Sequence, residues 1–284
     1  MTSVESLVDI IQLNIDSDEV IIGQEVFKSC SLRTRTELTQ WLYAVLHVRN
    51  TELLSQENGK SLEENIKESI QEKRIPISGE IKNYLGMRYI SVGGIRVAVD
   101  QGNHLEISKL RPNLTPGFFY YMNSMQEDQF EHLDTRYYIY ATNPDTALKT
   151  WSSIIENLEK QSICFSTKIL SNVQSYPRTD AIVIYSNKRD QHMILDVITE
   201  QSARTVKEEE KLHTSLLCKV VNPIISYAEQ PIFKGQQTSF GEDRCEAIAT
   251  AIKDSFSTGL DFSMLLTRRL ELAGINPDRI YENK

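Results

Sequence analysis

Residues 136–170 read RYYIYATNPDTALKTWSSIIENLEKQSICFSTKIL, and this stretch decides the fold class. The aromatic and β-branched run 136–141 predicts a strand. Asn143-Pro144 predicts the start of a helix, because asparagine caps helices and proline suits their first turn. Apolar residues then recur at the spacing of one helix face, at Leu148, Trp151, Ile155 and Leu158. The run 164–170 predicts a second strand, so the stretch combines a strand, an amphipathic helix and another strand.

The sequence pattern differs on the two sides of residue 85. Before it, apolar residues at helix-face spacing predict helices over 38–46 and 61–73. After it, short β-branched and aromatic runs such as 88–99 and 104–110 alternate with turn residues. We therefore expect an α+β protein.

Two regions are expected in this protein. The first, residues 1–85, is a helical N-terminal region that serves as a cap or docks a leader peptide or partner protein. The second, residues 86–284, is a mixed, mainly antiparallel sheet with flanking helices, and it carries the functional residues discussed below.

Composition excludes several classes of protein. The chain has 284 residues, with 31 Lys and Arg against 39 Asp and Glu, which gives a formal charge of -8. A nonspecific duplex-DNA-binding protein needs the opposite charge, so no nucleic acid partner is expected. The four cysteines form no CxxC pair and the five histidines show no ligand spacing. We therefore expect no metal and no cofactor.

The N-terminal stretch carries acidic residues where a secretory signal needs basic ones, and no run of eighteen apolar residues is present. These features predict a cytoplasmic bacterial protein with reduced thiols and without a membrane partner.

Lys168 is the first candidate for chemistry. Side chains alternate between the two faces of a strand, so Lys168 shares one face with Cys164 and Ser166. A lysine in the middle of a strand is either a solvent-facing residue of an edge strand or a functional amine. Composition alone favours the edge residue.

Arg136 and Arg178 also occupy positions that suit the binding of an anion. Arg136 opens the strand 136–141. Arg178 follows Pro177 directly before an apolar strand, where a rigid turn can aim its guanidinium. The alternative for Arg178 is a surface arginine paired with Asp180.

Arg244 stands in the first turn of a helix that the capping box Ser239-x-x-Glu242 predicts. This is the unfavourable end of the helix dipole for a cation, unless the helix amides and Arg244 bind one anion together. A surface arginine is an equally good interpretation.

Five segments together resemble the HopA-type effector-like proteins. They are LRPNLTPGF (110–118), RYYI (136–139), CFSTKIL (164–170), YPRTD (176–180) and SFGEDR (239–244). That family includes lyases of class V lanthipeptide and thioamitide biosynthesis, and it is similar in fold and site to the phosphothreonine lyases that bacterial pathogens inject into host cells. The resemblance covers roughly residues 85–260 and implies a phosphothreonine-lyase-like fold.

The resemblance implies β-elimination of phosphate from phosphoserine or phosphothreonine, which leaves dehydroalanine or dehydrobutyrine. This reaction needs a base for the Cα proton and cations for the departing phosphate. Lys168 suits the base, because burial and neighbouring guanidinium groups favour a neutral amine. Arg136, Arg178 and Arg244 suit the phosphate.

The general acid has more than one candidate. In the injected lyases a histidine stands two residues after a cation, and the matching position here is Tyr138. Tyrosine is a poor proton donor at neutral pH, so His104 or His132 are alternatives, and charge neutralisation by the arginines is another. We rank Tyr138 slightly above His104.

Substrate binding is expected from Tyr185, Ser239 and Phe118. The expected partners are a phosphorylated ribosomal precursor peptide, a separate Ser/Thr peptide kinase, because the chain has no kinase signature, and a cyclase. The alternative function is a non-catalytic HopA-type binding module that engages a phosphopeptide or a host protein.

Overall fold

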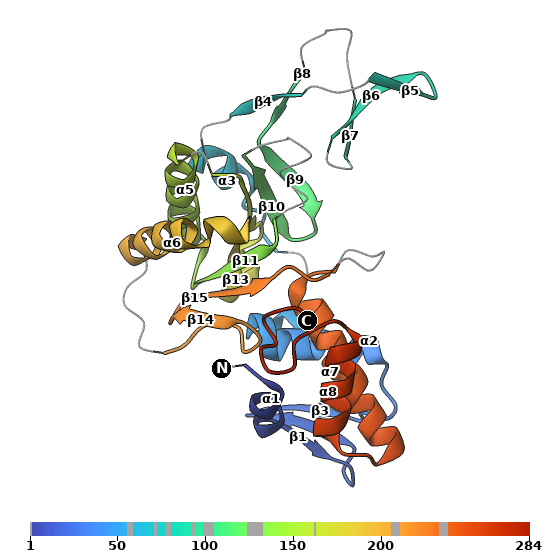
Figure 1. The fold of residues 1–284 in the computed structure, drawn as a ribbon. Coiled ribbons are helices and arrows are strands. Elements are labelled where there is room, and N and C mark those ends of the chain that lie inside the picture. Colours follow the sequence, from blue (N-terminus) through green and yellow to red (C-terminus); the bar gives the residue numbers. More distant parts are fainter. Residues whose placement is uncertain are drawn as a thin grey trace.

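The computed structural model describes residues 2–55, 59–70, 73–77, 81–92, 95–98, 105–123, 133–161, 163–205, 211–232 and 238–284. Its largest sheet has seven antiparallel strands in the order β14-β15-β11-β13-β12-β10-β9 (Figure 1). In chain order they are β9 (Leu110–Thr115), β10 (Phe118–Met122), β11 (Thr135–Ala141), β12 (Phe165–Leu170), β13 (Arg178–Ser186), β14 (Lys219–Asn222) and β15 (Ile225–Glu229). The expected α+β fold with a mainly antiparallel sheet is confirmed.

Helices α3 (Glu63–Ser69), α5 (Pro144–Lys160) and α6 (Gln191–Thr205) belong to the first face of this sheet. The predicted start of α5 is confirmed, because Asn143 Oδ1 accepts a hydrogen bond from Thr146 N at 3.0 Å. Trp151 of α5 donates to Thr167 Oγ1 of β12 at 3.0 Å. The predicted alternation of β12 is therefore correct, and Lys168 lies on the opposite face.

The second face of the sheet is covered by elements from both ends of the chain. They include α1 (Val4–Ile10), α2 (Arg35–Leu42), the π-helix η1 (Tyr43–Val48), α7 (Phe240–Thr258) and α8 (Phe262–Leu272). Apolar residues from 4–46 and 240–281 form a single buried cluster with the sheet. This core contains residues from both predicted regions. The division of the chain into two regions at residue 85 stays a prediction.

The N-terminal region contains more than the predicted helices. The short strands β1 (Ile11–Asn14), β2 (Glu19–Ile22) and β3 (Glu25–Lys28) form an antiparallel sheet near α1 (Figure 1). Val20 and Phe27 bury their side chains in the cluster shared with α7. The purely helical description is therefore corrected, because packing against other elements stabilises strands of only four residues. A 3-10 helix, η2 (Thr51–Leu54), follows.

Two smaller sheets are formed by the segment between α3 and β9. The first pairs β4 (Arg74–Ile77) with β8 (Leu105–Ser108). The second is formed by β5 (Ile81–Tyr84), β6 (Met87–Val92) and β7 (Ile95–Ala98), and it stands apart from the large sheet (Figure 1). Two 3-10 helices, η3 (Val173–Ser175) and η4 (Lys188–Asp190), flank β13. Among the described residues, no helix combines the length and the apolar character that crossing a membrane requires.

Candidate functional site

Lys168 lies inside the large sheet, because β12 has β10 on one side and β13 on the other. Its side chain is only 8% exposed, and its Nζ lies 3.9 Å from the centre of the Phe118 ring. Within the described part of the chain, the amine forms no hydrogen bond and no ion pair. The interpretation as a solvent-facing edge residue is therefore wrong.

Arg178 forms a two-pronged ion pair with Asp180. Nε and Nη2 donate to the two carboxylate oxygens, each at 2.7 Å, and both side chains are largely buried. Tyr43 donates its hydroxyl hydrogen to Asp180 and accepts from Arg178 Nη2, both at 3.4 Å. Arg178 also lies 5.6 Å from the centre of the Phe118 ring, so Phe118 contacts two cations.

Arg136 is buried on β11 and is held by neutral groups. Its Nε donates to Gln230 Oε1, and its guanidinium lies 5.2 Å from the centre of the Tyr185 ring. The Tyr185 ring stacks on Tyr120, whose hydroxyl is 3.0 Å from Ser166 Oγ. Within the described residues Arg136 forms no ion pair with a carboxylate, so its charge is available to an anion.

Strand register brings these groups to one face. Lys168 is opposite Val183, and Val183 is opposite Tyr138, which places Lys168 and Tyr138 two strands or about 10 Å apart at Cα. Arg136 is two residues from Tyr138 on the same face. We call Arg136, Lys168 and Arg178 the cation cluster. The register of β11 and β13 shifts at the end that carries Arg178 and Asp180.

The π-helix η1 closes the cation cluster from the second face of the sheet. Its residues Tyr43 and His47 are four apart, and the His47 ring lies 5.2 Å from Tyr43 and 5.1 Å from Tyr138. Thr179 donates to the His47 carbonyl, which ties η1 to β13. Short π-helical segments are rare in proteins, and those that occur are often found at functional sites. Neither residue was predicted from the sequence, because no local sequence pattern is specific for a π-helix that packs against a sheet in this way.

His47 and Tyr138 are uncharged at neutral pH. Burial lowers the pKa of His47 to about 4, and the three cations act in the same direction against the opposing effect of Asp180. Burial likewise raises the pKa of Tyr138 well above its usual value, although the charge of Arg136 opposes this. Among the described residues, the polar group that interacts with Tyr138 Oη is the Arg136 guanidinium, and the hydroxyl is otherwise buried without a polar partner. Both groups can therefore offer a neutral hydrogen bond to an anion.

Arg244 is not brought into contact with Lys168. It is fully buried and donates to the carbonyl oxygens of Ile280 and Glu282, to Asn283 Oδ1 and to Asp243 Oδ2. Arg244 thus holds the C-terminal segment against α7.

Ser239 is the N-cap of α7. Its hydroxyl accepts from Glu242 N at 3.2 Å, and its own backbone N–H donates to Glu242. The predicted capping box is confirmed, and in it the Ser239 hydroxyl oxygen is an acceptor, while the expected role of Ser239 in substrate binding stays a prediction.

His104 and His132, our alternatives for the general acid, lie outside the described residues. The described residues contain no cluster of metal-ligating side chains. What they bring together is a buried group of three cations with one carboxylate, lined by aromatic rings. Such a group suits a small anion such as a phosphate monoester.

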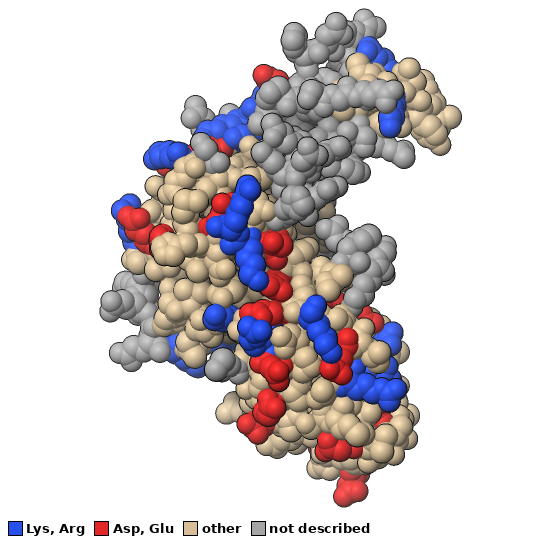
Figure 2. Space-filling view, in the orientation of Figure 1, with Lys and Arg blue, Asp and Glu red and all other residues tan. Residues whose placement is uncertain are grey.

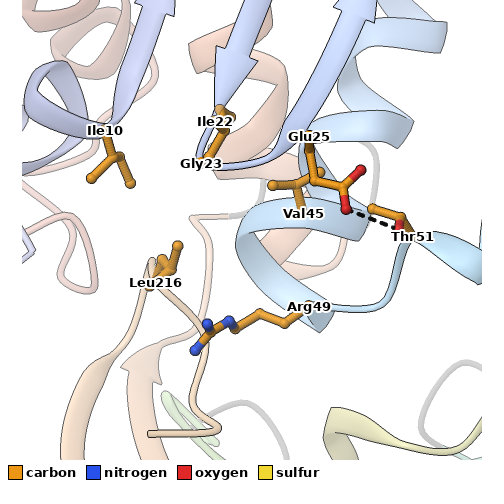
Figure 3. A pocket seen from close by; sticks show the side chains of 8 residues that line it. All are labelled: Ile10, Ile22, Gly23, Glu25, Val45, Arg49, Thr51 and Leu216. Carbon is orange, nitrogen blue, oxygen red and sulfur yellow. Dashed lines mark hydrogen bonds between the residues drawn. The ribbon is translucent and has the colours of Figure 1, made fainter.

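A separate hollow lies on the other side of η1 and shares no residue with the cation cluster (Figure 3). Its volume is about 340 Å³. It is lined by Ile10, Ile22, Gly23, Glu25, Val45, Arg49, Thr51 and Leu216. No predicted site residue contributes to it.

A sequence model of the HopA1 effector protein family matches residues 109–282. Two solved structures are similar to this chain. The effector protein from Pseudomonas syringae pv. syringae strain 61 shares 18% identity at a TM-score of 0.44, and that from Pseudomonas syringae pv. tomato strain DC3000 shares 20% at 0.45. Each match covers 59% of this chain and 63% of the effector, which is less than two thirds of its length. No curated protein matches the chain.

Proposed function

The chain belongs to the HopA1 effector protein family, and from this premise we propose that its cation cluster is the active site of a phospho-Ser/Thr lyase. The proposed substrate is a phosphorylated ribosomal precursor peptide. One observation carries the proposal. Lys168 is a buried amine without an ion pair in the described structure, and it shares the Phe118 ring with an arginine.

The proposed reaction needs no attacking water. The free-amine form of Lys168 takes the proton from Cα of the phosphorylated residue, and the electron pair of the Cα–H bond forms the Cα=Cβ double bond. The Cβ–O bond breaks, and its electron pair leaves with the phosphate. The products are a dehydroamino acid, inorganic phosphate and a protonated Lys168, which returns its proton to solvent.

Arg136 and Arg178 bind the phosphate in this proposal. Asp180 holds Arg178 in one orientation, so the guanidinium does not reorganise when charge develops on the leaving oxygen. Removing one such donor typically lowers the rate on the order of a hundred- to a thousandfold. Arg244 donates four of its five N–H groups to Ile280, Glu282, Asn283 and Asp243, so in this proposal it supports the C-terminal segment instead.

Two groups lie where a leaving oxygen can receive a hydrogen bond. Tyr138 remains our first candidate, and the interaction of its buried hydroxyl with the Arg136 guanidinium supports this role. His47 is a further candidate beside His104 and His132, which lie outside the described residues. It is neutral in the unliganded protein, and a phosphate dianion would favour its protonated form.

The proposal implies two further proteins. A separate kinase supplies the phosphorylated peptide, and a cyclase consumes the dehydroamino acid by adding a cysteine thiol to it.

A phosphoserine peptide tests the proposal directly. Incubated with the purified chain, it becomes lighter by one phosphoric acid in the mass spectrum if the protein is a lyase. The alternative, a non-catalytic phosphopeptide-binding module, returns the peptide intact.

Lys168→Ala then tests the base. The variant should still bind the phosphopeptide and lose on the order of a hundred- to ten-thousandfold in elimination rate. Lys188→Ala is the matched control, because Lys188 is exposed and paired with Glu229. Full turnover by Lys168→Ala would remove Lys168 from the mechanism.

A further inference from the structure

The sheet β5-β6-β7, which we call the hairpin arm, differs in charge from the rest of the protein. Its sequence, IKNYLGMRYISVGGIRVA over 81–98, contains three cations and no Asp or Glu, in a chain of net charge -8. The end of the arm that carries β5 and β6 shows blue and tan surface and no red on the visible face (Figure 2). The arm is therefore a local basic element on an acidic protein.

The tip of the hairpin between β5 and β6 is apolar and exposed. Tyr84, Leu85 and Met87 are 57%, 84% and 65% exposed. Leu85 and Gly86 form a two-residue turn, and Tyr84 and Met87 flank it. Lys82, which is exposed, and Arg88, which is half-buried, lie immediately behind them on the two strands. Three large apolar side chains thus stand at the end of the hairpin, with two cations at its base.

The backbone of the turn shows that Leu85 is not there to stabilise the hairpin. Leu85 and Gly86 have φ angles of +49° and +81°, as a type I′ turn requires. Asn-Gly is the preferred pair in this turn, and a branched aliphatic residue at positive φ is strained. An exposed leucine in this conformation is unfavourable both for the backbone and for its contact with water.

We propose that the hairpin arm docks the protein on an anionic lipid surface, with Leu85 and its apolar neighbours in the interface. The apolar and basic residues are separated along the axis of the hairpin rather than between its two faces. This arrangement suits end-on entry into a planar boundary, where the tip reaches the acyl chains and the cations meet lipid phosphates. It departs from our expectation that the protein has no membrane partner.

Pairing of the arm with an extended peptide fits the residues less well. Lys82 lies on β5, which is an edge strand of its sheet, and a lysine on an edge strand opposes the addition of another strand. The lipid proposal is also independent of the lyase proposal, since the cation cluster lies in another part of the molecule.

The test is flotation of the full chain with phosphatidylcholine vesicles that contain or lack phosphatidylglycerol. The protein should bind the anionic vesicles, and binding should fall as salt concentration rises. Leu85→Asn should weaken binding roughly ten- to a hundredfold, as expected for loss of one buried leucine. Lys82→Gln and Arg88→Gln should each weaken it about fivefold.

The variant Leu85→Asn separates docking from folding, because it creates the preferred turn sequence and should leave the melting temperature unchanged or higher. Leu32→Asn is the matched control, since Leu32 is 86% exposed and lies outside the arm. Absence of binding to the anionic vesicles, or equal binding by wild type and Leu85→Asn, would overturn the proposal. If the protein does not bind the anionic vesicles, an acidic protein becomes the partner to test for this surface.

Discussion

Arg178 and Asp180 hold each other through two parallel hydrogen bonds of 2.7 Å on the buried face of the sheet. Burial opposes ionisation of Asp180, yet the Arg178 guanidinium outweighs it and lowers the pKa of the carboxyl group to about 2. The pair is therefore charged throughout the physiological pH range. It fixes the orientation of one arginine of the cation cluster.

Asp180→Asn should cost about 3–5 kcal/mol in the free energy of unfolding, because it leaves Arg178 as a buried charge without its counter-ion. Urea unfolding measures this cost. Glu63→Gln is the control, since Glu63 pairs with Lys67 at the surface and its loss should cost less than about 1 kcal/mol. Similar costs for the two variants would contradict the structural role of the buried pair.

The stability of the protein should fall between pH 6.5 and pH 4 because of His47. Its pKa is about 4 in the folded protein and near 6.5 when unfolded, so the unfolded chain takes up a proton first as the pH drops. The free energy of unfolding then decreases by at most about 1.4 kcal/mol per pH unit in this window. Asp180 contributes only below about pH 5, where its carboxyl group in the unfolded chain begins to take up protons while the folded one stays ionised, and there its effect adds to that of His47.

His47→Gln should flatten this part of the stability curve, measured by urea unfolding at several pH values. His192→Gln, at an exposed position, should leave the slope unchanged. An unchanged slope in His47→Gln would assign the effect to another group.

Gly241→Ala should destabilise the protein by about 1–3 kcal/mol, although alanine normally favours a helix over glycine. A Cβ at this position would lie 2.6 Å from Tyr43 Cε2 and closer still to His47 Cδ2. The close approach of α7 to η1 therefore depends on the missing side chain. Thermal unfolding shows whether Gly241→Ala lowers or raises the stability. The loss of stability should be smaller in a His47→Ala background, because that variant removes one of the overlapping rings.

Arg244→Met should cost about 3–5 kcal/mol in unfolding free energy, since it deprives Asp243 and the carbonyls of Ile280 and Glu282 of their donor. At a temperature where the variant is folded, its phosphopeptide affinity should equal that of wild type by calorimetry. If the variant instead bound both the phosphopeptide and inorganic phosphate more weakly than wild type, the result would support the phosphate-binding role expected from the sequence. Arg35→Met, at an exposed pair with Glu246, controls for loss of a surface charge.

The stretch 136–170 was predictable because its signals are local. The cap at Asn143, the apolar face of α5 and the alternation around Lys168 depend only on neighbouring residues, and all three are confirmed. The strands β1–β3 were not predicted, because four-residue strands depend on burial of residues such as Phe27 beneath helices far along the chain. Local sequence patterns thus predict the longer helices and strands, whereas the short strands depend on packing against residues that are distant in the sequence.

The residues of the candidate site likewise fall into those that local sequence predicts and those that it does not. Strand alternation placed Lys168 correctly, and Asp180 was recognised as a possible partner of Arg178 from their proximity in sequence. Tyr43 and His47 were not found, because η1 reaches the sheet only through the tertiary fold and a π-helix has no simple sequence signature. For Arg244 the capping box predicted the helix correctly, but apart from its neighbour Asp243 the residues that accept its hydrogen bonds are almost forty positions away.

The core that joins residues 4–46 to 240–281 also determines the order of events on the ribosome. The early segment emerges first, but its apolar partners are translated nearly two hundred residues later, which takes roughly 10–40 seconds at ordinary rates of synthesis. During that interval side chains such as Leu38 and Leu42 have no native surface to cover them. Nascent chains of this protein are therefore expected to need chaperone protection until the final helices have left the exit tunnel.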